Sequence, residues 1–337
     1  MDISISSSAS KALHNIRGIA AFYVMLGHVA IIANYMPIVG KFFPDPVTLF
    51  FFISGMLIPL SLQKSNTMKS FVFHRIFRLF PVLIAITLLH LLFVKDGLLT
   101  ALFTATITFD IFGRVPQTSV YWTLAIEIHM YILYCIVYKF RPKIDALFPY
   151  IIVGILLALY TMAVIFGQKM AISILSRNLS CITLIVIGSA MLLKNKVHVV
   201  VLSLMFCVFV MCCTQNGFGL ANLEDKYMLI DVKDYGMMYK LMLLKIITGL
   251  VGFVVLMKAL QFKSKVLTFL GNISYPLYLL HVTVMDKIGI DKLHKQVTVV
   301  ALSCIIAYLI HKYIERPFVR KGKTFVAGKV DTVKQWW

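Results

Sequence analysis

The sequence predicts an all-α polytopic membrane protein, a single bundle of about ten transmembrane helices with both termini in the cytoplasm. The chain has 337 residues, of which 60% are hydrophobic, whereas an ordinary soluble domain is about half apolar. Its mean hydropathy is +0.88, and only 14% of its residues are charged. Apolar runs long enough to cross a bilayer recur along the chain, which is typical of multi-pass membrane proteins.

Ten of these runs are expected to cross the membrane, because a hydrocarbon core of about 30 Å requires roughly 20 helical residues. In chain order they cover residues 13–35, 47–63, 79–94, 120–138, 146–166, 170–193, 197–214, 238–257, 267–285 and 296–314. The stretch 98–120 is rich in threonine and contains Asp110, Arg114 and Pro116, so we expect it to be re-entrant or interfacial. Residues 1–337 should therefore form one integral membrane domain that ends in a basic cytoplasmic tail, 315–337.

The basic residues predict the orientation of these spans. Lysines and arginines gather in alternate loops, at 64–78, 139–143, 194–196 and 258–265, and in the tail. By the positive-inside rule this side is cytoplasmic, and most acidic residues fall on the opposite side, mainly within 222–236. Topology thus explains the net charge of +19, and we expect no binding of nucleic acid, because no segment could fold into a soluble basic face.

Two further features exclude other classes of protein. All six cysteines lie in apolar runs, and none has the spacing of a zinc site or a redox motif, so we predict no metal site and no disulfide. The first eleven residues are too polar for a signal sequence. We therefore expect the first apolar run to stay in the mature protein as a transmembrane helix.

The first span carries two ionisable residues, within the sequence HNIRGIAAFYVMLGH (14–28). Arg17 and His28 are eleven residues apart, which on a helix places them about 20° from the same face and about 16.5 Å apart along the axis. Ionisable groups inside a membrane are costly, so a functional interpretation is the default. The alternative is an arginine that snorkels to the headgroups and a histidine bonded to a neighbouring helix.

A second pattern, FHRIFRLFP (73–81), places Arg75 and Arg78 one turn apart at the cytoplasmic entrance to the third span. Two guanidinium groups on one face suit a polyanion, because each can hold phosphate oxygens in a fork. A flank that merely obeys the positive-inside rule would look the same. The pattern gains weight because Arg17 is expected at the same membrane face.

A third pattern is YWTLAIEIHMYILY (121–134), where Glu127 lies inside an otherwise apolar span. A carboxylate at that depth should be paired or protonated. Helical spacing aligns Glu127 with Thr123 and Tyr131, and Trp122 lies one residue further round. A catalytic role and a structural role as partner of an arginine are equally compatible with this pattern.

Near the end of the chain, LGNISYPLYLLH (270–281) places Tyr275, Tyr278 and His281 at successive intervals of three residues. Tyrosines near a helix end are often interfacial belt residues rather than ligands. By itself this pattern does not predict a site. The last span ends with YIERPF (313–318).

Taken in order, these segments resemble acyltransferase family 3, the integral membrane acyltransferases that include bacterial O-antigen and exopolysaccharide O-acetyltransferases. The resemblance rests on IRGIAAFYVMLGH, LFFFISGMLI (49–58), HRIFRLFP, YWTLAIEIHMY, LGNISYPLYLLH and IERPF. Each motif is modestly specific, but their ordered succession is strongly so. Between about 145 and 265 the chain matches only as generic apolar spans.

The resemblance implies an enzyme that moves an acyl group, usually acetyl, from cytoplasmic acyl-coenzyme A to a sugar hydroxyl. The acceptor would be a cell-surface polysaccharide (O-antigen, capsule or exopolysaccharide) or its undecaprenyl-linked precursor. In the family, the arginine and histidine of the first motif and the two arginines of R-x-x-R are tied to activity, and they match Arg17, His28, Arg75 and Arg78. The arginines would hold the donor's phosphates, and His28 would act as general base or as acyl carrier.

Other matched residues are expected to complete the site. Glu127 would orient His28 or neutralise an arginine. Five further residues are candidates for acceptor binding or support: Ser54, Trp122, Tyr275, Tyr278 and His281. We expect a bacterial cytoplasmic (inner) membrane location, no bound cofactor besides the acyl-coenzyme A substrate, and contacts with the lipid bilayer, the glycan acceptor and possible polysaccharide assembly proteins.

Some relatives carry an additional extracytoplasmic domain after the membrane part. This chain ends 23 residues after its last expected span. We therefore expect it to complete the transfer within the membrane domain or with a separate partner.

Two alternatives remain open at the level of sequence. Spans that contain buried charges also describe a secondary transporter of a small anionic or sugar-like substrate. A weak internal repeat between the two halves would favour that class, and none is visible. The second alternative is a non-catalytic assembly protein that keeps the family's packing motifs.

Overall fold

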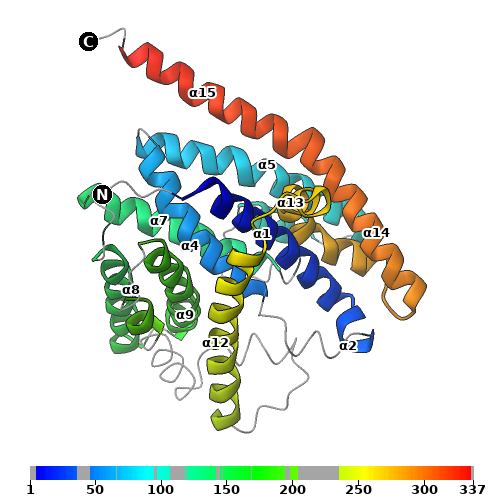
Figure 1. Ribbon diagram of the computed structural model, residues 1–337, viewed down its shortest axis with the longest axis horizontal. Coiled ribbons are helices and arrows are strands. Elements are labelled where there is room, and N and C mark those ends of the chain that lie inside the picture. Colours follow the sequence, from blue (N-terminus) through cyan, green and yellow to red (C-terminus); the bar gives the residue numbers. More distant parts are fainter. Residues whose placement is uncertain are drawn as a thin grey trace. The chain divides into compact units, whose positions relative to one another are not determined.

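Within the residues that the structure describes, every regular element is a helix, as the sequence predicts (Figure 1). The computed structural model describes residues 5–35, 46–65, 67–94, 97–106, 118, 120–141, 145, 147–167, 169–193, 198–203 and 235–334. In chain order the elements are α1 (Ser7–His28), α2 (Ile31–Tyr35), α4 (Pro46–Lys64), α5 (Met68–Val94), α6 (Leu98–Thr106), α7 (Tyr121–Phe140), α8 (Phe148–Ile165), α9 (Lys169–Leu192), α12 (Tyr235–Ala259), α13 (Lys265–Ile288), α14 (Leu293–Ile310), the π-helix η1 (His311–Glu315) and α15 (Arg316–Lys334).

Several of these helices are suited to a membrane. Among the described residues, four candidate spans are long and apolar enough to cross a bilayer: Pro46–Lys64, Met68–Val94, Tyr121–Phe140 and Leu293–Phe325. Three shorter apolar helical stretches lie at Phe148–Ala163, Cys181–Leu192 and Ile247–Ala259. Multiple apolar helices of this kind are typical of a multi-pass membrane protein.

Each expected span except 197–214 coincides with a described helix, and for that span only residues 198–203 are described. The first span differs from its expected bounds of 13–35. Ser6 caps α1 by accepting a hydrogen bond from the backbone N–H of Ala9 at 3.1 Å, so the helix begins at Ser7. It ends at His28 because Ala30 has a φ of 61°, which does not continue a right-handed helix.

Two other helices extend past the bounds expected from hydropathy. α5 begins at Met68 rather than at 79, so the R-x-x-R pattern is helical and continuous with the span. The tail expected at 315–337 is helical through Lys334, as α15.

In the stretch 98–120, α6 has only 9 residues, about 13.5 Å of helix, which is too short to cross a bilayer by itself. Asp110, Arg114 and Pro116 lie outside the described residues.

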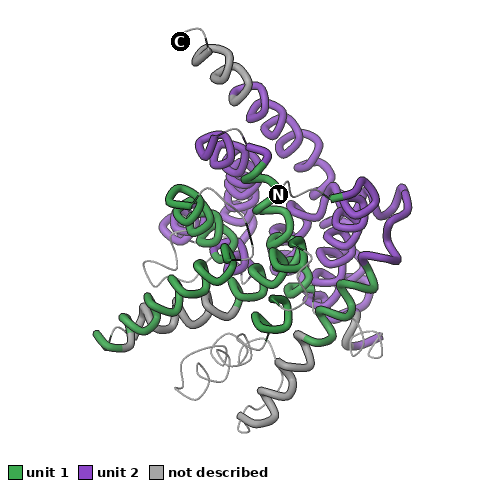
Figure 2. Tube along the Cα trace, turned by 60° about the vertical axis from the view of Figure 1, so that its left-hand side comes forward, with its two compact units in different colours: residues 1–5, 44–63, 126–256 green, residues 6–43, 64–125, 257–337 purple. Residues whose placement is uncertain are grey.

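The chain divides into two compact units, coloured separately in Figure 2. Unit 1 comprises residues 1–5, 44–63 and 126–256, and unit 2 comprises residues 6–43, 64–125 and 257–337. In unit 1, α4 and α9 meet at two glycines. A Cβ added to Gly55 would overlap the carbonyl of Ile185, and one added to Gly188 would overlap the carbonyl of Phe52. Only glycine allows the two backbones to approach this closely.

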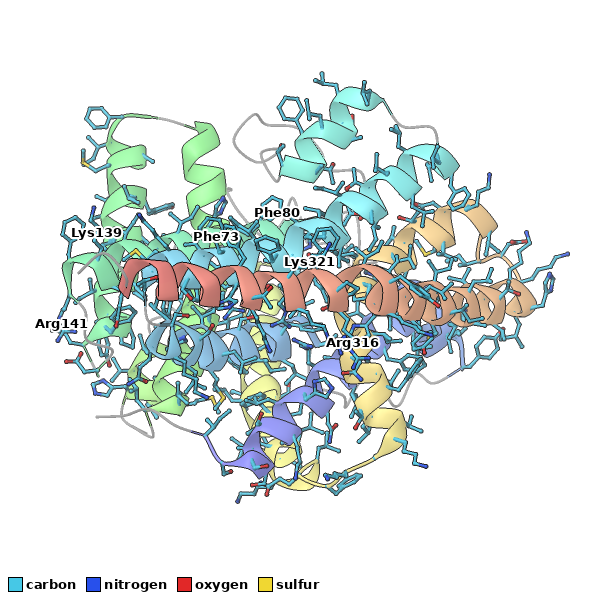
Figure 3. All side chains as sticks on the ribbon, turned by 90° about the horizontal axis from the view of Figure 1, so that it is seen from above. Phe73, Phe80, Lys139, Arg141, Arg316 and Lys321 are labelled. Atoms are coloured by element: carbon cyan, nitrogen blue, oxygen red, sulfur yellow. The ribbon has the colours of Figure 1, made fainter. Side chains whose placement is uncertain are left out.

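Unit 2 is organised around α13, which packs against α1, α5 and α14. α15 packs along α5, where Gly322 lies against Phe77 and the ring of Phe325 meets that of Phe73 with centroids 5.3 Å apart. Figure 3 labels Phe73 on α5 and shows Arg316 and Lys321 on α15. This basic helix is therefore attached to the unit through small and aromatic residues, and its residues Arg316, Arg320, Lys321 and Lys323 are exposed.

We predict that Gly55→Ala destabilises the protein by about 1–3 kcal/mol, because the added methyl group overlaps a backbone carbonyl that cannot move aside. Gly154→Ala in α8 is the matched control, since nothing lies within 4 Å of a Cβ at that position. There alanine should be neutral or stabilising, because it favours helix more than glycine does. Thermal unfolding of both variants in detergent checks this, and equal midpoints would contradict the close contact between α4 and α9.

Candidate functional site

The candidate site in unit 2 is built on the contact between α1 and α13. The helices approach most closely at Gly18 and Gly271, where a Cβ on Gly18 would overlap the backbone N of Gly271. Asn15 reinforces the contact by donating to the carbonyls of Leu260 at 2.9 Å and Phe262 at 3.2 Å, just before α13 begins. This contact determines which residues of the two helices face each other.

His28 and His281 meet at the far end of the same helix pair. The two glycines precede their respective histidines by the same ten residues (28 − 18 and 281 − 271), so the two helices run in the same direction and in step. The Nδ1 of His28 lies 2.8 Å from the Nε2 of His281, and the two rings stack with centroids 5.0 Å apart. His281 is fully buried, and its Nδ1 lies 3.1 Å from the carbonyl oxygen of Leu277.

Two tyrosines of α13 also make contacts inside unit 2. The hydroxyl of Tyr278 bonds that of Thr123 at 2.9 Å, and its ring meets the ring of His281 edge-on. Because Thr123 donates its own proton to the carbonyl of Val120 at 3.0 Å, Tyr278 is the donor in their bond. Tyr275 donates to the carbonyl of Leu79 at 2.9 Å. Both hydroxyls therefore join helices of the unit, rather than serving only as belt residues.

Arg17 lies at the other end of the α1–α13 contact. Its guanidinium donates to the carbonyl of Gly271 at 3.2 Å. Arg17 and Arg78 are both close electrostatic neighbours of His14, and so is His311 of η1. The Nε2 of His14 itself lies 3.4 Å from the carbonyl of Thr268. Arg17 and Arg78, which the sequence assigns to one membrane face, thus share a neighbourhood.

Arg75 has different surroundings from Arg78. Its guanidinium lies over the ring of Phe71 on its own helix, 5.1 Å from the centroid. It shares His74 as an electrostatic neighbour with Lys323 of α15. The two arginines of R-x-x-R therefore face different neighbours, because residues three apart on a helix point about 60° apart.

Sequence reasoning missed His14, His311 and Glu315. Glu315 is only 6% exposed, and its carboxylate pairs with the imidazole of His311 at 2.7 Å. The spacing of four residues in HKYIE would have indicated the pair of His311 and Glu315. The position of His14 one turn before Arg17 would have indicated that these two side chains are neighbours. What no local pattern could have predicted is that η1 and α1 lie close together.

Glu127 and Ser54 belong to unit 1. Glu127 accepts hydrogen bonds from the hydroxyls of Tyr131 and Ser54, the latter at 3.5 Å. Tyr131 is the residue that helical spacing aligned with Glu127, whereas Ser54 comes from α4. Trp122 is half-buried in the first turn of α7. The carboxylate of Glu127 is thus held by hydroxyl donors, as a polar group at that depth requires.

These groups define what the site can do chemically. The imidazole pair at one end of the α1–α13 contact can take a proton or carry a group. The basic cluster, about 16.5 Å away along α1, can bind an anion. Among the described residues, His, Cys, Asp and Glu side chains nowhere gather in the groups of three or more that a metal ion needs.

Comparison with known proteins identifies one family. Residues 10–312 match acyltransferase family 3, described as an acyltransferase domain. This range contains every site residue predicted from the sequence, whereas Glu315 and α15 lie beyond it. No curated protein and no solved structure matches the chain.

We predict that the two histidines are energetically coupled. His28→Leu and His281→Leu should each destabilise the protein, because each leaves the remaining imidazole without its partner. The double variant should lose less than the sum of the two, with a coupling of about 0.5–1.5 kcal/mol. Denaturant unfolding of the three variants and the parent in detergent measures the coupling. Additive losses would mean that the 2.8 Å contact contributes nothing to stability.

Proposed function

Because the chain belongs to acyltransferase family 3, we propose that it transfers an acetyl group from cytoplasmic acetyl-coenzyme A to a hydroxyl of a cell-surface polysaccharide. The acceptor is an O-antigen, capsule or exopolysaccharide, or its undecaprenyl-linked precursor, and the protein acts in the bacterial cytoplasmic membrane. The family establishes an acyltransferase. A secondary transporter, the alternative from the spans alone, has no observation in its favour beyond its helices.

The observation that supports this proposal is that α1 carries Arg17, a member of the basic cluster, and also His28, a member of the histidine pair. Acetyl-coenzyme A has phosphates at one end and a thioester at the other, joined by a long and nearly neutral pantetheine arm. Arg17 and Arg78, with His14 and His311 beside them, suit the phosphates, because guanidinium groups bind phosphate oxygens in a fork. His28 lies about 16.5 Å further along α1, about the reach of the arm.

The transfer needs one proton to move twice. In the proposed mechanism the acceptor hydroxyl gives its proton to the imidazole of His28, and its oxygen attacks the thioester carbonyl. The C–S bond breaks as the acetyl–oxygen bond forms, and His28 returns the proton to the thiolate of coenzyme A. No net proton is released. The competing route, in which His28 itself carries the acetyl group, uses the same imidazole nitrogen as a nucleophile.

The remaining site residues support this chemistry in different ways. The ring of Tyr278 contacts that of His281, and we propose that Tyr275 and Trp122 support the site. Within unit 1, we propose Glu127 and Ser54 as residues that bind sugar hydroxyls, because a carboxylate accepts hydrogen bonds from hydroxyl groups. Arg75 is proposed to add to the positive potential around the donor.

We predict that His28→Ala lowers acetyl transfer by about 10²–10⁴-fold, because a general base contributes that much to a rate. Membranes carrying each variant are incubated with radiolabelled acetyl-coenzyme A and the polysaccharide of the source organism. His294→Ala, an exposed histidine of α14, is the control and should match the parent. Equal labelling of the glycan by the parent and His28→Ala would reject this mechanism.

A separate prediction concerns the donor. Arg78→Ala should raise KM for acetyl-coenzyme A by about 10-fold or more, because a hydrogen bond to a charged group contributes about 1.5–3 kcal/mol. Arg75→Ala should raise it less, since the guanidinium of Arg75 already lies over the ring of Phe71. Initial rates at varied donor concentration measure both. If Arg75→Ala has the larger effect, the phosphates bind on the α15 side of α5 instead.

A further inference from the structure

The hydrogen bonds of His281 determine which of its nitrogens carries a proton. Its Nδ1 lies 3.1 Å from the carbonyl oxygen of Leu277, one turn earlier on α13. A carbonyl oxygen can only accept a hydrogen bond, so the Nδ1 of His281 must be the N–H that donates. In a neutral imidazole the other nitrogen, Nε2, then holds a lone pair and can only accept.

The same reasoning extends to His28. The Nε2 of His281 lies 2.8 Å from the Nδ1 of His28, so the Nδ1 of His28 must carry the proton of this bond. The lone pair of a neutral His28 is then on Nε2, the nitrogen that faces away from His281. Two hydrogen bonds thus form one directed chain, from His28 through His281 to the carbonyl of Leu277.

We propose that His281 is the positioning residue that sets the tautomer of His28 and leaves Nε2 of His28 as the reactive nitrogen. This inference rests on the proposed function and adds to it the residue on which the base depends. A hydrogen bond at one ring nitrogen of a histidine determines its tautomer, and the tautomer decides whether the other ring nitrogen can act as the base. The same holds wherever a histidine base is oriented by a partner. Here the orienting partner is a second neutral imidazole rather than a carboxylate.

The chain also serves the transfer step itself. When Nε2 of His28 takes the proton of the acceptor hydroxyl, His28 becomes a cation, and its Nδ1–H bond to His281 becomes charge-assisted and stronger. His281 stays neutral throughout. Nε2 then gives the same proton to the departing thiolate of coenzyme A, which restores the starting tautomer of His28.

The packing of α13 holds His281 in this orientation. Its side chain is completely buried, and the ring of Tyr278 meets it edge-on at 6.1 Å between centroids. Gly18 and Gly271 keep α1 and α13 in step ten residues earlier. A shift of one residue along either helix would separate the two imidazoles by a further 1.5 Å and turn them about 100° apart.

The test uses two replacements of His281 that differ in one property. His281→Gln keeps an acceptor oxygen near the position of Nε2 and an N–H donor, whereas His281→Leu keeps only the volume. His90→Leu is the control, because His90 is also buried and bonds Thr283 of α13 at 3.0 Å. We measure kcat and KM for acetyl-coenzyme A in membranes.

We expect His281→Leu to lower kcat about 10–100-fold with KM nearly unchanged, which is less than the loss from removing the base itself. His281→Gln should recover most of that loss, and His90→Leu should match the parent. If the role of His281 were purely structural, the amount of active protein would fall alike for His281→Leu, His281→Gln and the control His90→Leu. Equal activity of His281→Leu and the parent would overturn the proposal.

A second measurement does not depend on activity. Nitrogen NMR of the full-length protein labelled at its nine histidines, with His28 assigned from the signals lost in His28→Gln, reports which ring nitrogen is protonated. We expect His28 of the parent protein to have a protonated Nδ1 and an unprotonated Nε2. In His281→Leu we expect His28 to be a mixture of the two tautomers. A parent protein in which His28 is protonated on Nε2 overturns the proposal. If the parent transfers no acetyl group, the proposed function fails, whereas the spectrum still decides the tautomer.

Discussion

The close approach of α1 and α13 at Gly18 and Gly271 is the constraint on which the candidate site depends. Neither position has room for a Cβ, so the two backbones are held in direct contact and cannot slide past each other. Arg17 bonds the carbonyl of Gly271 at this point, and ten residues further along both helices the imidazole of His28 meets that of His281. One backbone contact therefore determines the position of both ends of the site.

Several polar groups inside this protein pair across helix boundaries. His28 bonds His281, Tyr278 bonds Thr123, and Glu127 accepts from Ser54. In a hydrocarbon environment an unpaired polar group costs several kcal/mol, so such pairs determine which helices are neighbours.

α1 and α13 also show why hydropathy alone is a partial guide, since neither is apolar enough to be among the four candidate spans. Their polar residues face each other.

The basic end of the site draws on a distant part of the chain. α14 continues through the π-helix η1 into α15, and a π-turn widens the helix by one residue, a feature frequent at functional sites. Within that turn Glu315 is buried against His311, which is an electrostatic neighbour of His14. The negative charge of a carboxylate reduces the net positive charge of a basic cluster. The basic side chains of the cluster therefore repel one another less strongly, and the cluster can still bind an anion.

The sequence by itself determined the all-helical class, the approximate places of most described helices, the common face of Arg17 and His28, the alignment of Glu127 with Tyr131, and the family. These follow from hydropathy, from helical periodicity and from motifs in a fixed order. Only the tertiary structure decided that His281 is the partner of His28, that Arg17 and Arg78 are both electrostatic neighbours of His14, and that Ser54 donates to Glu127. Residues 253 positions apart in the chain meet at the histidine pair. Such contacts depend on how helices pack, and that depends on the fit of surfaces such as Gly18 against Gly271, which no local period encodes.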